Sequence, residues 1–142
     1  MSGITLMIES RFDNLSLVGK AVNKLCTEFF SDKEVWSIEL CVVEAVNNVI
    51  KHAYHGGENG RVLISLQFFG SEVVMEIKDT GSKIPSEILQ EKDGRVFDFD
   101  PENRDSLPEG GMGLALIKMS MDEVSYSSHN GTNTLRLVKK AA

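Results

Sequence analysis

Five polar residues between Glu44 and His52 have the types and spacing that phosphate chemistry uses. Glu44, Asn48 and His52 follow one another at intervals of four, with Asn47 and Lys51 between them. In a helix with about 3.6 residues per turn, all five project from one arc. A buried or half-buried carboxylate is the kind of group that serves as a general base. An amide oxygen can bind a hard cation such as Mg²⁺.

A solvated face of an amphipathic helix is the alternative interpretation of this polar stripe. Two features of the sequence disfavour it. The preceding turn is apolar nearly all round, and Leu40 and Cys41 project over the same arc as Glu44. The stripe also carries asparagines where a solvated face usually carries a mixture of lysine and glutamate. We therefore expect the stripe to begin where the helix is already buried.

Two glycine-containing segments downstream supply the remaining candidates. Asp79 ends an expected strand two residues before Gly81, a pair that a plain turn also explains. Gly110, Gly111 and Gly113 precede an expected helix, and N–H groups at a helix N-terminus attract phosphate. The segment is not a Walker A motif, because no GK[ST] follows, and it is not a dinucleotide fingerprint, because no strand directly precedes it.

The surrounding periodicity predicts the elements that position these residues. Ser31, followed three residues later by Glu34, predicts a capping box at the start of a long helix, and Asn14 is a plausible cap for the helix before it. Two hairpin turns are expected, at Gly70-Ser71 and at Asn130-Gly131. Strands are expected at 4–10, 61–69, 72–79, 123–128 and 133–140, and helices at 14–30, 32–54, 86–90 and 112–123.

This order predicts an α+β fold, a two-layer α/β sandwich with a mixed sheet and helices on one face. With 142 residues, the chain suits one domain over 1–142. Residues 82–111 read as a long loop with eight acidic and four basic side chains, which gives −4 of the net charge of −6. Loops this long inside a compact domain are usually functional or disordered.

The composition argues against several classes of partner. A net charge of −6 makes duplex DNA or an anionic membrane a poor partner. No signal peptide or membrane-spanning stretch is visible, so we expect a cytoplasmic protein. Cys26 and Cys41 fall among apolar helix residues and are expected to be buried free thiols. Acidic residues at 98, 100, 102 and 109 fit a calcium loop poorly, because Asn103 replaces its turn glycine.

Taken in order, the motifs resemble those of a known superfamily. E-x-x-x-N-x-x-x-H on a helix, D-x-G after a strand, a long loop and G-x-G-L before a helix are similar to the histidine-kinase-like ATPases, the GHKL group of gyrase, Hsp90 and histidine kinases. Within that group the chain resembles the stand-alone anti-sigma factor serine/threonine kinases, over about residues 4 to 140. The resemblance implies a Bergerat-type ATP-binding fold.

The resemblance also implies roles for individual residues. Glu44 would be the general base, and Asn48 would hold the Mg²⁺ that bridges the phosphates of ATP. Asp79 would accept a hydrogen bond from the adenine amino group, and Gly81 would let the backbone lie close to the ring. Thr134 resembles a strand threonine beneath the nucleotide.

The loop at 82–111 resembles the family's ATP lid. Backbone groups of Gly111, Met112, Gly113 and Leu114 would cradle phosphate, and Arg104, with Arg95 as its rival, would be a lid cation. Lys51 and His52 would line the pocket. Many relatives have D-x-G-x-G at the second motif, whereas Ser82-Lys83 follow Gly81 here, which implies a stiffer lid hinge.

Two functions follow from the resemblance. The first is a kinase that phosphorylates a serine or threonine of a STAS-domain anti-anti-sigma factor and also binds a sigma factor, with a homodimer as a further expectation. The second is a nucleotide-dependent module that binds a regulator with little phosphotransfer. Glu44 favours the first, because a base is needed only if phosphoryl transfer occurs.

Overall fold

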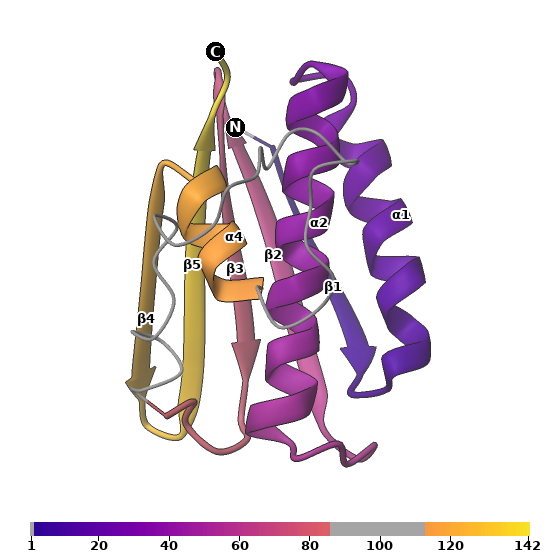
Figure 1. The fold of residues 1–142 in the computed structure, drawn as a ribbon, viewed down its shortest axis with the longest axis vertical. Coiled ribbons are helices and arrows are strands. Elements are labelled where there is room, and N and C mark those ends of the chain that lie inside the picture. The colour runs from indigo at the N-terminus through magenta and orange to yellow at the C-terminus, as the bar shows by residue number, and fades with distance from the viewer. Residues whose placement is uncertain (1, 86–112) are drawn as a thin grey trace.

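The computed structural model describes residues 2–85 and 113–142, in the order β-α-α-β-β-α-β-β (Figure 1). The strands are β1 (Ser2–Glu9), β2 (Arg61–Phe69), β3 (Glu72–Asp79), β4 (Glu123–His129) and β5 (Thr132–Lys140). The helices are α1 (Leu15–Cys26), α2 (Asp32–Asn48) and α4 (Gly113–Ser120), with a 3₁₀ turn η1 (Phe12–Asn14) and a π-helical turn η2 (Val49–Ala53). The expected helix at 86–90 lies outside the described residues.

The strands form one sheet in the order β1-β2-β3-β5-β4, and the helices cover one of its faces (Figure 1). This confirms the α+β prediction, but the expectation of a mixed sheet is wrong for the described strands, since every neighbouring pair is antiparallel. One helix between β1 and β2 would have returned the chain parallel to its start. Here α1 and α2 form an antiparallel pair between the strands, so β2 runs opposite to β1.

The core lies between the sheet and the helices. Alternate residues of β2 and β3 are buried on one face, as the two-residue period of a strand requires. Burial of these apolar side chains supplies the main stabilisation of the layer contact. Cys26 and Cys41 are buried and free, as expected, and burial raises the pKa of both thiols to about 12. In the described part of the chain, no helix is long and apolar enough to cross a membrane.

The capping box at the start of α2 is confirmed. The Ser31 hydroxyl accepts from the Glu34 N–H at 3.3 Å, and the Glu34 carboxylate accepts from the Ser31 N–H at 2.9 Å. The second oxygen of Glu34 accepts from the Ala142 N–H at 2.9 Å. These bonds outweigh the burial of Glu34, which acts in the opposite direction, and leave the pKa of its carboxyl below the ordinary value.

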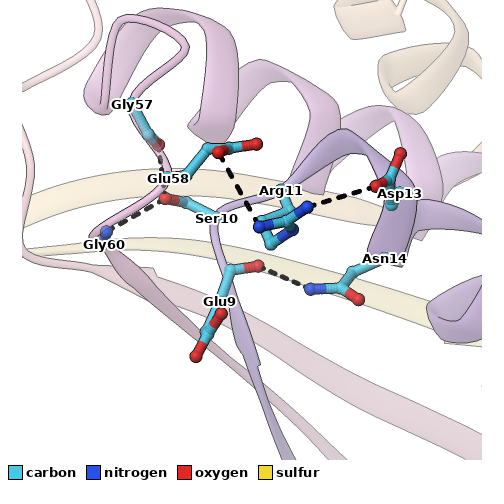
Figure 2. Close-up of polar contacts among 8 residues, drawn as sticks. All are labelled: Glu9, Ser10, Arg11, Asp13, Asn14, Gly57, Glu58 and Gly60. Carbon is cyan, nitrogen blue, oxygen red and sulfur yellow. Dashed lines mark hydrogen bonds and ion pairs between the residues drawn. The ribbon is translucent and has the colours of Figure 1, made fainter.

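The predicted cap at Asn14 is wrong. Asn14 has helical backbone angles and makes no side-chain cap bond. Its amide instead donates to the Glu9 carbonyl at 3.0 Å, which closes the connection between β1 and α1 (Figure 2). The 3₁₀ turn before α1 already supplies a helical approach, so the amide is used to hold the strand end.

Both predicted hairpins are present. The β4–β5 turn has positive φ at Asn130 (51°) and Gly131 (80°), the combination that a tight two-residue hairpin requires. This turn sets the register in which β5 pairs with β4. In the separate ladder between β3 and β5, Asn133 lies opposite Asp79.

We predict that Ser31→Ala lowers the free energy of unfolding by about 1 kcal/mol, because the Glu34 N–H loses its acceptor at the start of α2. Urea denaturation followed by circular dichroism measures the change. Ser16→Ala, at an exposed position in the first turn of α1, is the matched control and should be close to neutral. An equal loss in both variants would show that the capping box contributes nothing specific.

Candidate functional site

The helix that carries the polar stripe changes geometry just after Asn48. The sequence predicted one helix over 32–54, whereas the structure has an α-helix to Asn48 and a π-helical turn over Val49–Ala53. Such turns are rare and occur often at functional sites. The turn brings the Ala53 carbonyl to the Ser82 N–H, which donates to it at 2.8 Å. The end of the helix is thereby fastened to the segment that follows β3.

Gly81 is required by this close approach. A Cβ built on Gly81 would lie 2.4 Å from the Ala53 carbonyl oxygen, closer than real Cβ contacts allow. The neighbouring atoms belong largely to the backbone and cannot swing aside. The sequence motif D-x-G therefore has a packing reason in this chain, which is independent of any ligand.

Tyr54 holds the same segment from the other side. Its hydroxyl donates to the Arg61 carbonyl at 2.6 Å and accepts from the Thr80 N–H at 3.0 Å. This one oxygen joins the end of the helix to the start of β2 and to the end of β3. Thr80 and Gly81 are thus positioned by backbone contacts, without help from a ligand.

The loop after the π-helical turn is held by Ser10. The Ser10 hydroxyl is fully buried, donates to the Gly57 carbonyl at 2.6 Å and accepts from the Gly60 N–H at 3.0 Å (Figure 2). Beside it, the Arg11 guanidinium lies 3.7 Å from Glu58. The end of β1 thus supports the loop that leads from the helix into β2.

Asp79 is the most enclosed carboxylate of the motifs, with 3% of its surface exposed. Its Oδ1 accepts from the Gly81 N–H at 2.9 Å and from the Asn133 amide at 2.8 Å. Burial raises the pKa of Asp79 above its ordinary value, and the bonds from Asn133 and Gly81 act in the opposite direction. The arrangement presents a buried carboxylate with a fixed orientation.

Asn133 is a site residue that the sequence interpretation missed, in favour of Thr134. Asn133 is buried and points to the helix-covered face with Asp79. Since side chains alternate along a strand, Thr134 points to the opposite face, where its register partner is Lys78. The structure therefore does not bring Thr134 to Asp79. The alternation of Leu135 and Leu137 in the sequence could have assigned Asn133 to the covered face, but only the pairing of β3 with β5 places it opposite Asp79.

Glu44 and Asn48 lie one turn apart on α2, and both are partly buried. Burial raises the pKa of Glu44, and the charge of Lys51 opposes that rise. The side-chain nitrogen of Asn48 is buried and has no hydrogen-bond partner among the described residues. Because such a group is costly to leave unpaired, an amide in this state is suited to a ligand.

Of the other three polar residues of the stripe, Lys51 is exposed, and Asn47 and His52 are partly buried. Burial lowers the pKa of His52, and the charges of Lys51 and His55 lower it further. His55 itself lies at the helix end, where its Nε2 is 3.2 Å from the Ser82 hydroxyl.

The glycine-rich motif is described only from Gly113 onward. Gly113 begins α4, which packs against α2, and Leu114 is buried in the core with 5% of its surface exposed. This contact brings the start of the third motif to the helix that carries the first. Arg95, Arg104, Gly111 and Met112, together with the acidic residues at 98, 100, 102 and 109, lie outside the described residues.

Within 2–85 and 113–142, no group of three or more His, Cys, Asp or Glu side chains gathers to hold a metal ion. The side-chain oxygen of Asn48 is the one protein ligand that the sequence analysis assigns to a metal ion. A single amide ligand fits Mg²⁺ that takes its remaining ligands from water and from substrate phosphates, rather than a cation caged by protein alone.

The chain matches the model of the histidine kinase-like ATPase domain over residues 8–139. It is 36% identical over 107 residues to serine-protein kinase RsbW of Staphylococcus aureus, an alignment that covers 75% of this chain and 65% of the relative. It is 29% identical over 102 residues to serine-protein kinase RsbW of Oceanobacillus iheyensis, over 72% of this chain and 63% of the relative. The matched part therefore spans less than two thirds of these relatives.

The fold is also found in solved structures. The crystal structure of the RsbU and RsbW domains of a Mycobacterium tuberculosis protein matches 99% of this chain and 32% of that one, with a TM-score of 0.67 and 14% identity. The catalytic domain of the histidine kinase ThkA matches 99% of this chain and 97% of that one, with a TM-score of 0.52 and 16% identity. At these identities the likeness shows a shared fold. Because the family model matches residues 8–139, nearly the whole chain, the chain belongs to the histidine kinase-like ATPase domain family.

Proposed function

We propose that this chain binds Mg-ATP and transfers the γ-phosphoryl group to a serine or threonine hydroxyl of a STAS-domain anti-anti-sigma factor. The observation that carries this proposal is the partly buried carboxylate of Glu44, one turn from Asn48, whose buried side-chain nitrogen has no partner among the described residues and can donate to a phosphate oxygen. Two relatives named serine-protein kinase RsbW support the choice of a protein substrate. A sigma factor is the second proposed partner, in a partner-switching pathway, and the active species is proposed to be a homodimer.

In the proposed reaction, Glu44 accepts the proton of the attacking serine or threonine hydroxyl. At the same time the hydroxyl oxygen forms a bond to the γ-phosphorus. The bond from that phosphorus to the bridging oxygen breaks, and ADP leaves. The raised pKa of Glu44 suits this role, because a base works best when its pKa approaches the working pH. The charge of Lys51 opposes that rise and so favours the ionised carboxylate.

Asn48 would hold the magnesium ion, whose chemistry when bound is to neutralise charge on the phosphates. The metal would bind the side-chain oxygen of Asn48, while the buried nitrogen of the same amide, which has no partner among the described residues, would donate to an acceptor such as a phosphate oxygen. The backbone of Gly111, Met112, Gly113 and Leu114 would approach the phosphates. Arg104 in the lid is the proposed cation near the γ-phosphate, and Lys51 and His52 line the same pocket.

Asp79 would accept a hydrogen bond from the adenine amino group. Its carboxylate is buried and held by two donors on one oxygen. The corresponding edge of guanine carries an oxygen that accepts hydrogen bonds, so an ionised Asp79 would repel it. Gly81 lets the backbone beside the ring stay close to Ala53.

We predict that Glu44→Gln lowers the rate of phosphotransfer to the partner by about 10²–10⁴-fold, because it removes the general base. Mg-ATP at about 100 times its Kd should still raise the free energy of unfolding of this variant by about 2.7 kcal/mol. Transfer is measured with γ-labelled ATP and purified antagonist, and binding by thermal shift. Glu28→Gln, an exposed charge near the end of α1, is the matched control.

A normal transfer rate in Glu44→Gln would show that Glu44 is not the general base. If the native protein yields no phosphoprotein but its affinity for the partner still depends on nucleotide, the chain is a regulator-binding module. Phosphosite mapping of proteins retained with and without ATP separates these outcomes and identifies the substrate residue.

The transfer rate should fall as the pH is lowered, because Glu44 must be ionised to accept a proton. Since burial raises its pKa, the fall should occur above the ordinary glutamate range. Lys51→Met removes the opposing charge and should move the fall to higher pH. Single-turnover rates between about pH 4 and pH 8 measure the pH profile of the native protein and of the variant. An unchanged pH profile in Lys51→Met would show that the charge of Lys51 does not influence the ionisation of the base.

We predict that Asp79→Asn raises the Kd for ATP by about tenfold or more, since the bond to the amino group loses its charged acceptor. Isothermal titration measures the affinity, and the free energy of unfolding without nucleotide checks that the fold is intact. Asp13→Asn, at an exposed carboxylate, is the control. Unchanged ATP affinity in Asp79→Asn would contradict the adenine contact.

A further inference from the structure

We propose that Asn133 is the positioning residue that makes Asp79 selective for an amino-bearing base, and that Ser128 fixes the orientation of the Asn133 amide. This inference rests on the nucleotide site proposed above. Asn133 does not need to touch the base itself. It acts through Asp79, because its hydrogen bond determines which oxygen of Asp79 faces the base and favours the ionised form of that carboxylate.

The geometry defines the amide without ambiguity. The Asn133 nitrogen lies 2.8 Å from Asp79 Oδ1, 3.0 Å from the Gly81 carbonyl and 3.5 Å from the Ser82 carbonyl. All three neighbours are acceptors, so the atom facing them must be the NH₂ group. On the other side, the Ser128 hydroxyl donates to the amide oxygen at 2.6 Å. Each polar atom of the buried Asn133 side chain therefore has a partner.

The consequence for Asp79 is an unequal pair of oxygens. Within the described residues, both hydrogen bonds to the carboxylate, from Gly81 and from Asn133, reach Oδ1. Oδ2 is left to accept from a ligand. Because both partners are donors, they favour the ionised carboxylate, which only accepts. A protonated carboxyl would carry an O–H and could donate to the oxygen of guanine.

Other charged and polar groups around this carboxylate do not supply the same restraint. Lys78 precedes Asp79 on β3 and so points to the opposite face of the sheet. From the helix end, the Tyr54 hydroxyl is engaged with Thr80, and His55 reaches the Ser82 hydroxyl at 3.2 Å. Among residues 2–85 and 113–142, the donors that hold Asp79 are therefore the backbone N–H of Gly81 and the side chain of Asn133.

The first test is Asn133→Leu, which removes the donor and keeps a side chain of similar length. The Kd for ATP should rise about tenfold, while the Kd for GTP changes much less, so that discrimination between the two bases narrows. The loss should deepen as the pH falls, because Asp79 then protonates more readily than in the native protein. The ratio of variant to native Kd at each pH cancels the titration of the nucleotide phosphates.

The second test is Asn133→Asp, which has the same shape and reverses the sign of the pH effect. At high pH two carboxylates face each other and ATP binding should be weaker than in the native protein. As the pH falls, the pair takes up one proton, which can restore a donor toward Asp79, so ATP affinity should recover. A residue that only filled space would not produce opposite pH slopes in the leucine and aspartate variants.

Ser128→Ala tests the outer bond, at an exposed position that tolerates change. It should raise the Kd for ATP in the same direction but less than Asn133→Leu, and it carries the test if the leucine variant fails to fold. Thr132→Val, on the opposite face of β5 from Asn133, is the matched control and should leave the Kd for ATP and GTP and their pH profile unchanged. Thermal unfolding without nucleotide monitors the fold throughout.

The outcomes separate the two proposals. If the native protein binds ATP tightly but Asn133→Leu and Ser128→Ala keep the native affinity, base selectivity and pH profile, the role of Asn133 is overturned and the nucleotide site stands. If the native protein binds neither ATP nor GTP, the proposed function itself has failed, and the selectivity proposal falls with it.

Discussion

The contact between the end of the α2 helix and the end of β3 is the constraint on which the rest of the site depends. The Ala53 carbonyl accepts from the Ser82 N–H, and Gly81 lies too close to Ala53 for any side chain to fit. The π-helical turn allows the helix to reach this point, and the Tyr54 hydroxyl secures Thr80 beside it. Contacts between backbone atoms therefore fix the position of the helix that carries the polar stripe relative to the end of β3, which carries Asp79.

The two carboxylates of the site are held in different ways. Glu44 is partly buried on a helix and meets the charge of Lys51, which limits the rise of its pKa. Asp79 is almost fully enclosed at a strand end, where neutral donors from Asn133 and Gly81 have the same effect. This difference is consistent with the roles proposed for them, a proton acceptor for Glu44 and a hydrogen-bond acceptor for the adenine amino group for Asp79.

The sequence located most elements because their signals are local. The Ser31–Glu34 capping box, the two hairpin turns and the two-residue alternation of β3 each depend on neighbouring residues, and each is present. The failures have more than one cause. Asn14 was expected to cap a helix but bonds to Glu9, and the π-helical turn after Asn48 follows a pattern that reads as continuous helix. The expectation of a mixed sheet failed because the direction of β2 relative to β1 depends on how the two intervening helices pack.

The sequence by itself determined the family, through the order and spacing of Glu44, Asn48, Asp79 and the glycines, since the family model matches residues 8–139. It also determined the α+β order of the elements, through periodicity and turn chemistry. The tertiary structure alone decided that Asn133, and not Thr134, meets Asp79. The physical reason is that a shift of one residue along a strand moves a side chain to the other face of the sheet, and only the pairing of β3 with β5 fixes that register.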